Sequence, residues 1–163
     1  MRRKDREITS KEEIKDIIKK ALFCNVAMCR DNIPYLVPMN FGFDGQHFYL
    51  HSAPEGLKID ILKENPRVCI EITQDLKINQ SEDVCKTSMR YSSVIIFGKV
   101  EFLFDRRERI NALNCIVEQL YGERATTKEE KPMFNEDNLN KLTIIRVRPE
   151  QITGKRSVSS EEN

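Results

Sequence analysis

The chain has 163 residues, of which 39% are hydrophobic and 33% charged, and its formal net charge is +1 at pH 7. This length fits one domain, and the balanced charge argues against electrostatic attraction to nucleic acid or to an anionic membrane. No apolar run approaches a membrane span, and charged residues follow the basic N-terminus where a signal peptide would be apolar. We therefore expect a cytoplasmic protein with a single domain over residues 1–153. So little apolar surface favours a cofactor site shared between subunits over a deep site within one chain.

The five cysteines are scattered along the chain, and no Cys-x-x-Cys pair occurs. This excludes a zinc ribbon and a thioredoxin-like motif. Cys69 and Cys115 lie among apolar residues and are expected to be buried, reduced thiols. Cys85 lies in a polar stretch, where a tolerated free cysteine is favoured over a reactive thiol.

The first predicted element is a helix that begins after Ser10, because Ser10 and Glu13 form a capping box and apolar residues follow at helical spacing. Three strands are predicted next, over residues 23–30, 33–43 and 46–52. They are separated by the turn pairs Asp31-Asn32 and Asp44-Gly45. Since short turns join antiparallel neighbours, residues 23–52 are expected to form a three-stranded meander.

A short helix is predicted to follow Gly56 and to end at Asn65, because the residue before a proline avoids helical geometry. Four further segments complete the pattern, in chain order: a strand over 67–74, a polar long loop or hairpin excursion over 75–89, the longest β-patterned stretch over 91–104 with Gly98 as a bulge or bend, and a helix from Asp105 to Gly122. The helix is expected to bury Ile110, Leu113, Val117, Leu120 and Tyr121. The remaining predictions are a charged loop over 123–139, a last strand over 142–152 and a disordered tail over 154–163.

The predicted fold is therefore mainly β, with six antiparallel strands and peripheral helices. Strands joined in this way usually close or half-close into a barrel, because open sheet edges promote aggregation.

No standard catalytic constellation is visible. The chain has two histidines and lacks a Gly-x-Ser-x-Gly motif, a phosphate loop and a Gly-x-Gly-x-x-Gly motif. His47 and His51 could point to one face of a strand, but without a carboxylate partner they make a poor metal site. We expect no metal and place His47 in an exposed turn.

A phosphate site is possible where the third strand meets the second helix. Ser52 ends the strand, and Lys58 lies in the first turn of the helix, whose N-terminal amides add further donors. The alternative is that Lys58 is an ordinary solvated helix residue, and these residues alone favour that alternative.

Five short motifs occur in a characteristic order: Pro38-Met39-Asn40-Phe41, His51-Ser52-Ala53, Gly56-x-Lys58, Asn65-Pro66-Arg67-Val68 and Tyr91-x-Ser93-Val94-x-x-Phe97-Gly98. With them the chain resembles the 5-nitroimidazole-resistance (Nim) branch of the pyridoxamine 5′-phosphate oxidase-like superfamily, from about residue 3 to about residue 152. The resemblance implies a split β-barrel of the FMN-binding type and a homodimer that binds FMN in a cleft between its subunits.

The resemblance also implies roles for individual residues. Pro38, Met39 and Asn40 would run beside the isoalloxazine ring. His51, Ser52 and Ala53 would follow the ribityl chain and phosphate, and Lys58 would pair with the phosphate. Further flavin contacts would come from Arg90, Tyr91, Ser92 and Ser93, of which Arg90 or Ser92 would complete the phosphate shell.

Two departures from the superfamily pattern concern the phosphate site. Leu57 stands where the vitamin-processing oxidases carry an arginine, which argues against oxidation of pyridoxamine phosphate. Ser92 stands where relatives in this branch commonly carry an arginine.

The leading functional hypothesis is a flavin reductase that takes electrons from a nicotinamide donor and passes them to a small oxidant such as a nitroaromatic. His51 could donate a proton, although a packing or phosphate-side role is equally compatible with its position. Two alternatives remain: a non-catalytic flavin- or haem-binding protein, with His51 as the axial haem ligand, and an interaction module without a ligand.

Overall fold

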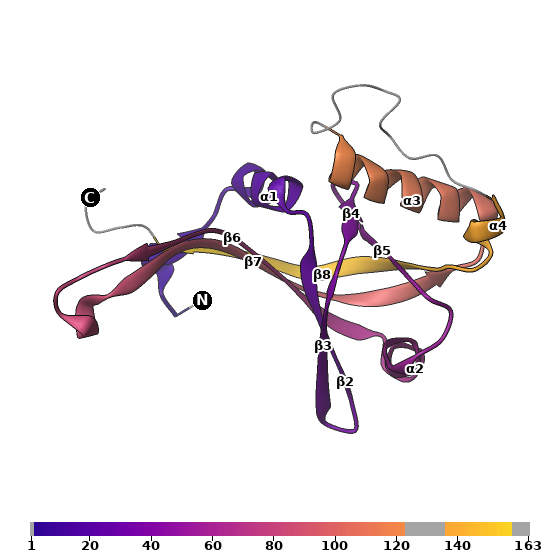
Figure 1. Cartoon of the computed structure of the whole chain (residues 1–163), viewed down its shortest axis with the longest axis horizontal. Helices are drawn as coiled ribbons and strands as arrows, with labels where there is room; N and C mark the ends of the chain where they lie inside the picture. Colours follow the sequence, from indigo (N-terminus) through magenta and orange to yellow (C-terminus); the bar gives the residue numbers. More distant parts are fainter. Residues whose placement is uncertain (1, 123–135, 158–163) are drawn as a thin grey trace.

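A computed structural model describes residues 2–122 and 136–157. Its described strands form one antiparallel sheet with the order β3-β2-β6-β7-β8-β5-β4, and β1 pairs with β8 (Figure 1). The strands are β1 Glu7–Ile8, β2 Cys24–Arg30, β3 Ile33–Met39, β4 Phe41–Phe43, β5 Phe48–Ser52, β6 Arg67–Asn79, β7 Ser88–Leu103 and β8 Thr143–Ser157. The helices are α1 Lys11–Lys20, α2 Leu57–Glu64, α3 Arg106–Tyr121 and α4 Glu136–Leu139, with 3-10 turns η1 Lys4–Arg6 and η2 Val84–Lys86.

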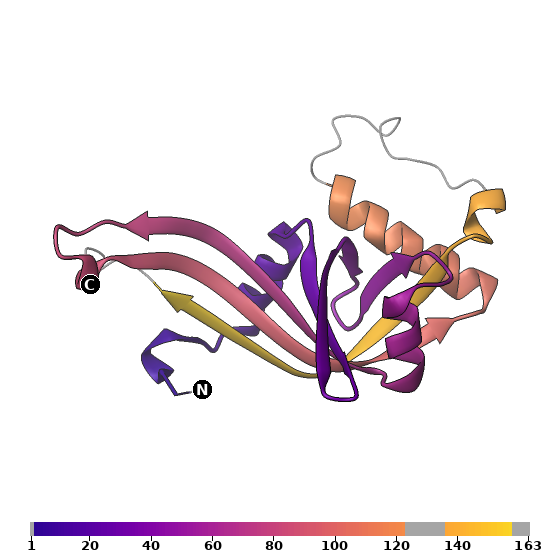
Figure 2. The same ribbon diagram turned by 60° about the horizontal axis from the view of Figure 1, so that its bottom comes forward.

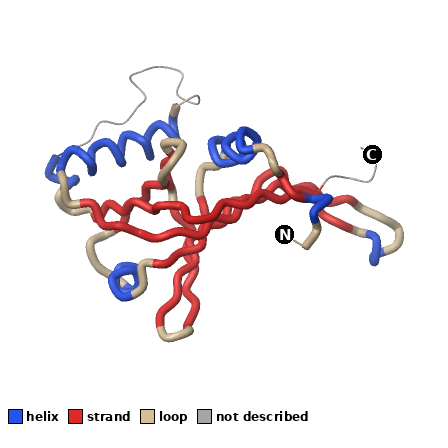
Figure 3. Tube along the Cα trace, turned by 180° about the vertical axis from the view of Figure 1, so that it is seen from behind, coloured by secondary structure: helices blue, strands red, loops and turns tan. Residues whose placement is uncertain are grey.

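The two end strands of the sheet, β3 and β4, are separated in the chain by Asn40 alone. The sheet therefore curls until its ends meet at this residue, which gives a half-closed barrel. The helices lie around it: α1 and α3 on one side of the long strands, and α2 on the other (Figure 3). The predicted class, a mainly β split barrel with peripheral helices, is confirmed.

The predicted meander over residues 23–52 is wrong. Strand β3 pairs with β2 and strand β4 with β5, and these two hairpins lie at opposite ends of the sheet. The chain changes pairing partners at Asn40, whose side-chain amide donates to the carbonyl of Leu22 at 3.2 Å. Such a switch is typical of a strand that turns a corner. Because of this division and the additional β1, the sheet has eight described strands instead of six.

Three long strands extend further than predicted. Strands β6 and β7 continue beyond Gln74 as a hairpin arm that projects from the body of the molecule (Figure 2), so the hairpin is the correct alternative for residues 75–89. The register of this arm shifts between Gln74 and Lys77. Strand β8 continues to Ser157, so residues 154–157 are ordered strand and not part of a disordered tail. Of the predicted charged loop, residues 123–135 lie outside the described residues, as does 158–163 of the tail, and Glu136–Leu139 is α4.

The barrel interior forms the main core. Its largest fully buried side chains include Phe41, Phe48, Leu50, Ile70 and Ile96. A second apolar cluster joins α3 to the sheet. The buried face of α3 is Ala112, Leu113, Ile116 and Gln119, whereas the predicted Tyr121 is 41% exposed.

Gly98 lies at an irregularity of the sheet, as predicted. The residue paired with β7 changes from Gln151, opposite Phe97, to Pro149, opposite Gly98, so the extra residue is Glu150 in β8. A Cβ atom on Gly98 would lie 2.5 Å from the carbonyl oxygen of Arg148. Glycine is therefore required here by the close approach of the two backbones.

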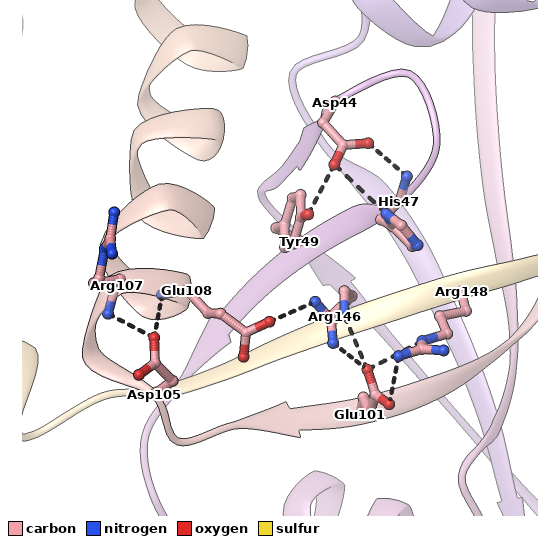
Figure 4. A network of polar contacts seen from close by, with 9 residues as sticks. All are labelled: Asp44, His47, Tyr49, Glu101, Asp105, Arg107, Glu108, Arg146 and Arg148. Atoms are coloured by element: carbon pink, nitrogen blue, oxygen red, sulfur yellow. Dashed lines mark hydrogen bonds and ion pairs between the residues drawn. The ribbon is translucent and has the colours of Figure 1, made fainter.

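Polar contacts attach α3 to the end of the sheet (Figure 4). The carboxylate of Asp105 accepts from the amides of Arg107 and Glu108, both at 3.0 Å, and caps the helix. Glu108 in turn accepts from Arg146 of β8 at 3.0 Å. The helix start is thus fixed by its own cap and by an ion pair to the sheet.

Candidate functional site

The turn between β5 and α2 carries the predicted phosphate residues. Gly56 precedes the helix with a φ of 115°, a conformation that favours glycine, and its carbonyl accepts from Ile59 at 2.8 Å. Three apolar residues of α2 are buried against the barrel, Ile59, Ile61 and Leu62. This packing fixes the rotation of α2 and places Lys58 at its first turn, half-buried.

Lys58 and His51 are two neighbouring basic groups that are both half-buried. Burial lowers the pKa of Lys58, and no carboxylate of residues 2–122 and 136–157 forms an ion pair with it. Burial and then the charge of Lys58 lower the pKa of His51. A partly desolvated cation without a counter-charge is unfavourable unless an anion binds. The pair is therefore suited to a phosphate group.

The predicted neighbours of Lys58 point in different directions. Ser52 is 8% exposed and lies on the interior face of β5 with Leu50, whereas His51 lies on the opposite face. Ala53 is exposed in the turn. Hence the side chains of His51 and Ser52 point to opposite faces of β5, although both residues are close to the start of α2 in the chain.

The second predicted group, Arg90 to Ser93, is remote from this turn within one chain. His51 pairs with Ile144, which pairs with Leu103 at the far end of β7. Ser92 lies eleven residues earlier in β7, which corresponds to roughly 35 Å of extended strand. The structure therefore does not bring the two halves of the predicted site together in a single protomer.

The four residues at the start of β7 are also divided between two faces of the sheet. Ser92 pairs with Gln74 and Arg156, and with Arg90 it lines a cavity of about 250 Å³ below α1. Tyr91 and Ser93 alternate with them and lie on the opposite face. Tyr91 nevertheless borders the cavity that Arg90 and Ser92 line, so of these four residues only Ser93 is absent from its lining.

Residues 38–40 lie at the edge of the sheet. Pro38 and Asn40 are exposed, but the side chain of Met39 is 7% exposed and belongs to the core. Any ligand beside this edge would meet the backbone of Met39 and not its side chain.

Sequence reasoning missed a polar cluster in the adjacent strands, where Glu71 accepts from Asn25 at 2.9 Å and from Thr73. The glutamate within a β-branched run was the available signal.

None of the described helices covers the sheet face that carries Pro38, Tyr91 and Ser93. Strand pairing places Leu36, Ala27, Cys69 and Phe97 in one row across this face, and Leu36 and Phe97 are 59% and 49% exposed.

The predicted burial of Cys69 and Cys115 is only partial: both are half-buried, and burial raises the pKa of each thiol, that of Cys115 to about 11. Cys85 is exposed.

The remaining features of the described residues do not add a site near Lys58. A larger cavity, of about 770 Å³, lies between α1, α3 and the β4–β5 turn and contains none of the predicted site residues. Within this part of the chain no three potential ligands are grouped to hold a metal ion. His47 lies in the β4–β5 turn, where its amide donates to Asp44 (Figure 4). None of the described helices is long and apolar enough to cross a membrane.

Comparison with known proteins gives the family. The family model described as pyridoxamine 5′-phosphate oxidase matches residues 10–156. The chain belongs to this family. The predicted resemblance is thereby confirmed at the level of the family.

Two solved structures and one curated protein show how far the similarity extends. A candidate 5-nitroimidazole antibiotic resistance protein of Bacteroides thetaiotaomicron is 36% identical, with 92% of this chain and 86% of that chain covered and a TM-score of 0.76. The FAD and heme binding protein of Mycobacterium smegmatis has a TM-score of 0.81 at 20% identity, covering 96% and 78% of the two chains, which shows a shared fold. Protein RA0666 of Rhizobium meliloti (strain 1021) is 32% identical over 96 residues, and the match spans 59% of this chain and only 56% of that protein.

Proposed function

We propose that this protein binds FMN and acts as a reductase of small oxidants such as nitroaromatics, with electrons from a nicotinamide donor. The observation that carries the proposal is the half-buried cation of Lys58, which lies beside His51 without an ion pair to a described carboxylate. The terminal phosphate of FMN carries negative charge and acceptor oxygens, and it would therefore serve as the counter-ion of this lysine. Ser52 and the amides at the start of α2 are its further donors.

A homodimer would complete this site. The two predicted halves lie roughly 35 Å apart along one protomer, and the sheet face between them exposes apolar side chains, including Phe97. If two copies pack through this face in opposite directions, the start of β7 in one copy approaches the β5–α2 turn of the other. The isoalloxazine ring would then lie beside residues 38–40, and Tyr91 and Ser93 of the second copy would lie on the phosphate side of the flavin.

Bound FMN would supply hydride acceptance and electron transfer, which the side chains of this chain do not provide. The chain would hold the cofactor by its phosphate at Lys58 and by backbone groups of Pro38 to Asn40. The similarity to the candidate 5-nitroimidazole antibiotic resistance protein of Bacteroides thetaiotaomicron supports a nitroaromatic oxidant. His51 lies close enough to Lys58 to respond to charge on the phosphate.

A haem-binding or non-catalytic protein is the second candidate, favoured by the likeness in fold to the FAD and heme binding protein of Mycobacterium smegmatis. The lowered pKa of His51 keeps its imidazole neutral, as metal ligation requires. Lys58 favours FMN over haem, because a monoester phosphate fits a point charge at a helix start better than a haem propionate does.

The test uses the purified full chain loaded with FMN. Anaerobic stopped-flow mixing with NADH and with NADPH should bleach the flavin absorbance, and a second mixing with a nitroimidazole should restore it. Flavin that binds but is not reduced by either donor would identify a non-catalytic binding protein. A Soret band on reconstitution with haemin, without any FMN binding, would favour the second candidate.

A further inference from the structure

A second group of cations lies at the start of β7, on the sheet face that carries Pro38. Strand β1 pairs with β8 so that Glu7 stands opposite Lys155, and Lys155 stands opposite Ser93 of β7. This pairing also fixes the 3-10 turn η1 beside the end of β8 (Figure 2). Arg6, the last residue of η1, is thereby held close to Tyr91, although the two are far apart in sequence.

The cations converge on the phenol of Tyr91. The ammonium nitrogen of Lys155 lies 5.6 Å from the centre of the Tyr91 ring. The pKa of Tyr91 is lowered, first by its hydrogen bond to Lys155 and further by hydrogen bonding to Arg6. Ser93 lies two residues further along β7 on the same face, opposite Lys155. An ammonium, a guanidinium and two hydroxyls are thus gathered within one small area.

This arrangement differs from an ordinary surface ion-pair cluster. Glu7 faces Lys155 across the strand pair, yet no ion pair of Lys155 with a carboxylate of the described residues is formed, and the ammonium lies over the aromatic ring instead. The guanidinium of Arg6 lies 4.0 Å from the carboxylate of Asp5, which is already bound by Arg3 at 2.6 Å. Two like charges beside one phenol repel each other, and a multiply charged anion would relieve that repulsion.

We propose that Lys155, Arg6 and the hydroxyls of Tyr91 and Ser93 form a subsite for a phosphoryl group. A phosphoryl group accepts several charge-assisted hydrogen bonds at once, and the four side chains supply donors of that kind. The group could belong to FMN, bound mainly by the second copy, or to the diphosphate of a nicotinamide donor. The identity of the compound rests on the proposed function, whereas the phosphoryl chemistry rests on these four residues.

The test compares Lys155→Met with Lys99→Met. Both variants remove one positive charge from the same face of the sheet and keep the aliphatic stem, but Lys99 is paired with Glu150 at 3.1 Å and lies outside the subsite. Tyr91→Phe, which keeps the ring and removes the hydroxyl, serves as a second subsite variant. Affinities for FMN and for riboflavin are measured by fluorescence titration, and KM values for NADH and NADPH by steady-state reduction.

If the subsite holds the flavin phosphate, the preference for FMN over riboflavin should fall about tenfold in Lys155→Met, the size of one charged hydrogen bond. If it holds the donor diphosphate, that preference should persist while KM for the donor rises about tenfold. Lys99→Met should change neither quantity.

Inorganic pyrophosphate separates failure of the subsite from failure of the proposed function. It should raise the Tm of the native chain and do so less for Lys155→Met. If the native chain binds no flavin, the proposed function fails, and the pyrophosphate result still decides on the subsite. Equal protection of both chains by pyrophosphate, with unchanged flavin preference and donor KM, would overturn the subsite.

Discussion

Cations in two regions of the molecule differ in their partners. At the end covered by α3, Arg146 contacts the carboxylates of Glu101 at 2.6 Å and Glu108 at 3.0 Å (Figure 4). On the surfaces assigned to ligands, Lys58 and Lys155 have no such partner among the described carboxylates. Lys58 is half-buried, so solvent offsets its charge only in part.

We interpret the paired cations as groups that stabilise the fold and the unpaired ones as groups that bind the proposed ligands. A paired arginine lowers the free energy of the folded state, so its removal should decrease the free energy of unfolding. A half-buried lysine without a counter-charge raises that free energy, so its removal should cost binding and not stability. The contrast can be tested by neutralising one cation of each kind.

The largest effect is expected for Lys58→Met. Loss of a charged hydrogen bond to phosphate should weaken FMN binding by about 1.5–3 kcal/mol. The free energy of unfolding without flavin should stay within about 0.5 kcal/mol of the native value, or rise, because a desolvated charge has been removed. Fluorescence titration and urea unfolding measure the two quantities on the same sample.

Lys63→Met is the matched control, since Lys63 lies exposed in the last turn of the same helix. It should leave FMN affinity and stability unchanged. The assignment of Lys58 would be wrong if both lysine variants bound FMN equally well, or if Lys58→Met unfolded more readily than Lys63→Met without a change in affinity.

A smaller effect, on stability instead of FMN binding, is expected for Arg146→Met. The variant leaves Glu101 and Glu108 without their shared partner, and we expect a loss of about 1–2 kcal/mol in the free energy of unfolding, moderated because both carboxylates are partly exposed. FMN affinity should be unaffected. Arg148→Met is the control, since Arg148 is 58% exposed and, among the described carboxylates, pairs only with Glu101. Similar losses in both arginine variants would remove the special role of Arg146.

Local features of the fold could be predicted from the sequence because they depend on neighbours in the chain. Ser10 accepts from the amide of Glu13 at 3.2 Å, as the capping box predicted, and Asp105 caps α3. Strand pairing across the barrel could not be predicted in the same way. The switch at Asn40 moves β4 to the other end of the sheet, and no turn signal marks it, since Met39 and Phe41 are both buried as in a continuous strand.

The candidate site shows the same limit. Ser52 and Lys58 are separated by one short turn, so a motif was sufficient to suggest them. Lys155 and Arg6 come near Tyr91 only through the register of β1, β8 and β7, which no local pattern reveals. For the same reason, sequence reasoning grouped Arg90 to Ser93 together, although alternation along β7 sends them to two faces.

The smallest expected effect concerns pH and His51. In the flavin-free protein, burial and then the charge of Lys58 hold the pKa of His51 below 6.5. The unfolded chain therefore binds the proton more tightly, and the stability contributed by neutral His51 is present above about pH 6.5 and lost as the pH falls through the folded pKa. Urea unfolding of the flavin-free protein between about pH 7.5 and pH 5.5 should show this loss, and His51→Gln should reduce it.

A bound phosphate reverses the preference of His51, because its negative charge favours the imidazolium. FMN binding should then take up a proton, and the native chain should gain affinity relative to His51→Gln as the pH falls from about 7.5 to about 6, by several-fold or under about 1 kcal/mol. The comparison with His51→Gln is essential, since the phosphate of FMN itself gains a proton near pH 6 and weakens binding in both chains. Riboflavin, which has no phosphate, should show no difference between the two chains. If the native chain and His51→Gln kept a constant ratio of FMN affinities across this range, His51 would lie too far from the phosphate to respond to its charge. The proposed phosphate site would then depend on Lys58 without a contribution from His51.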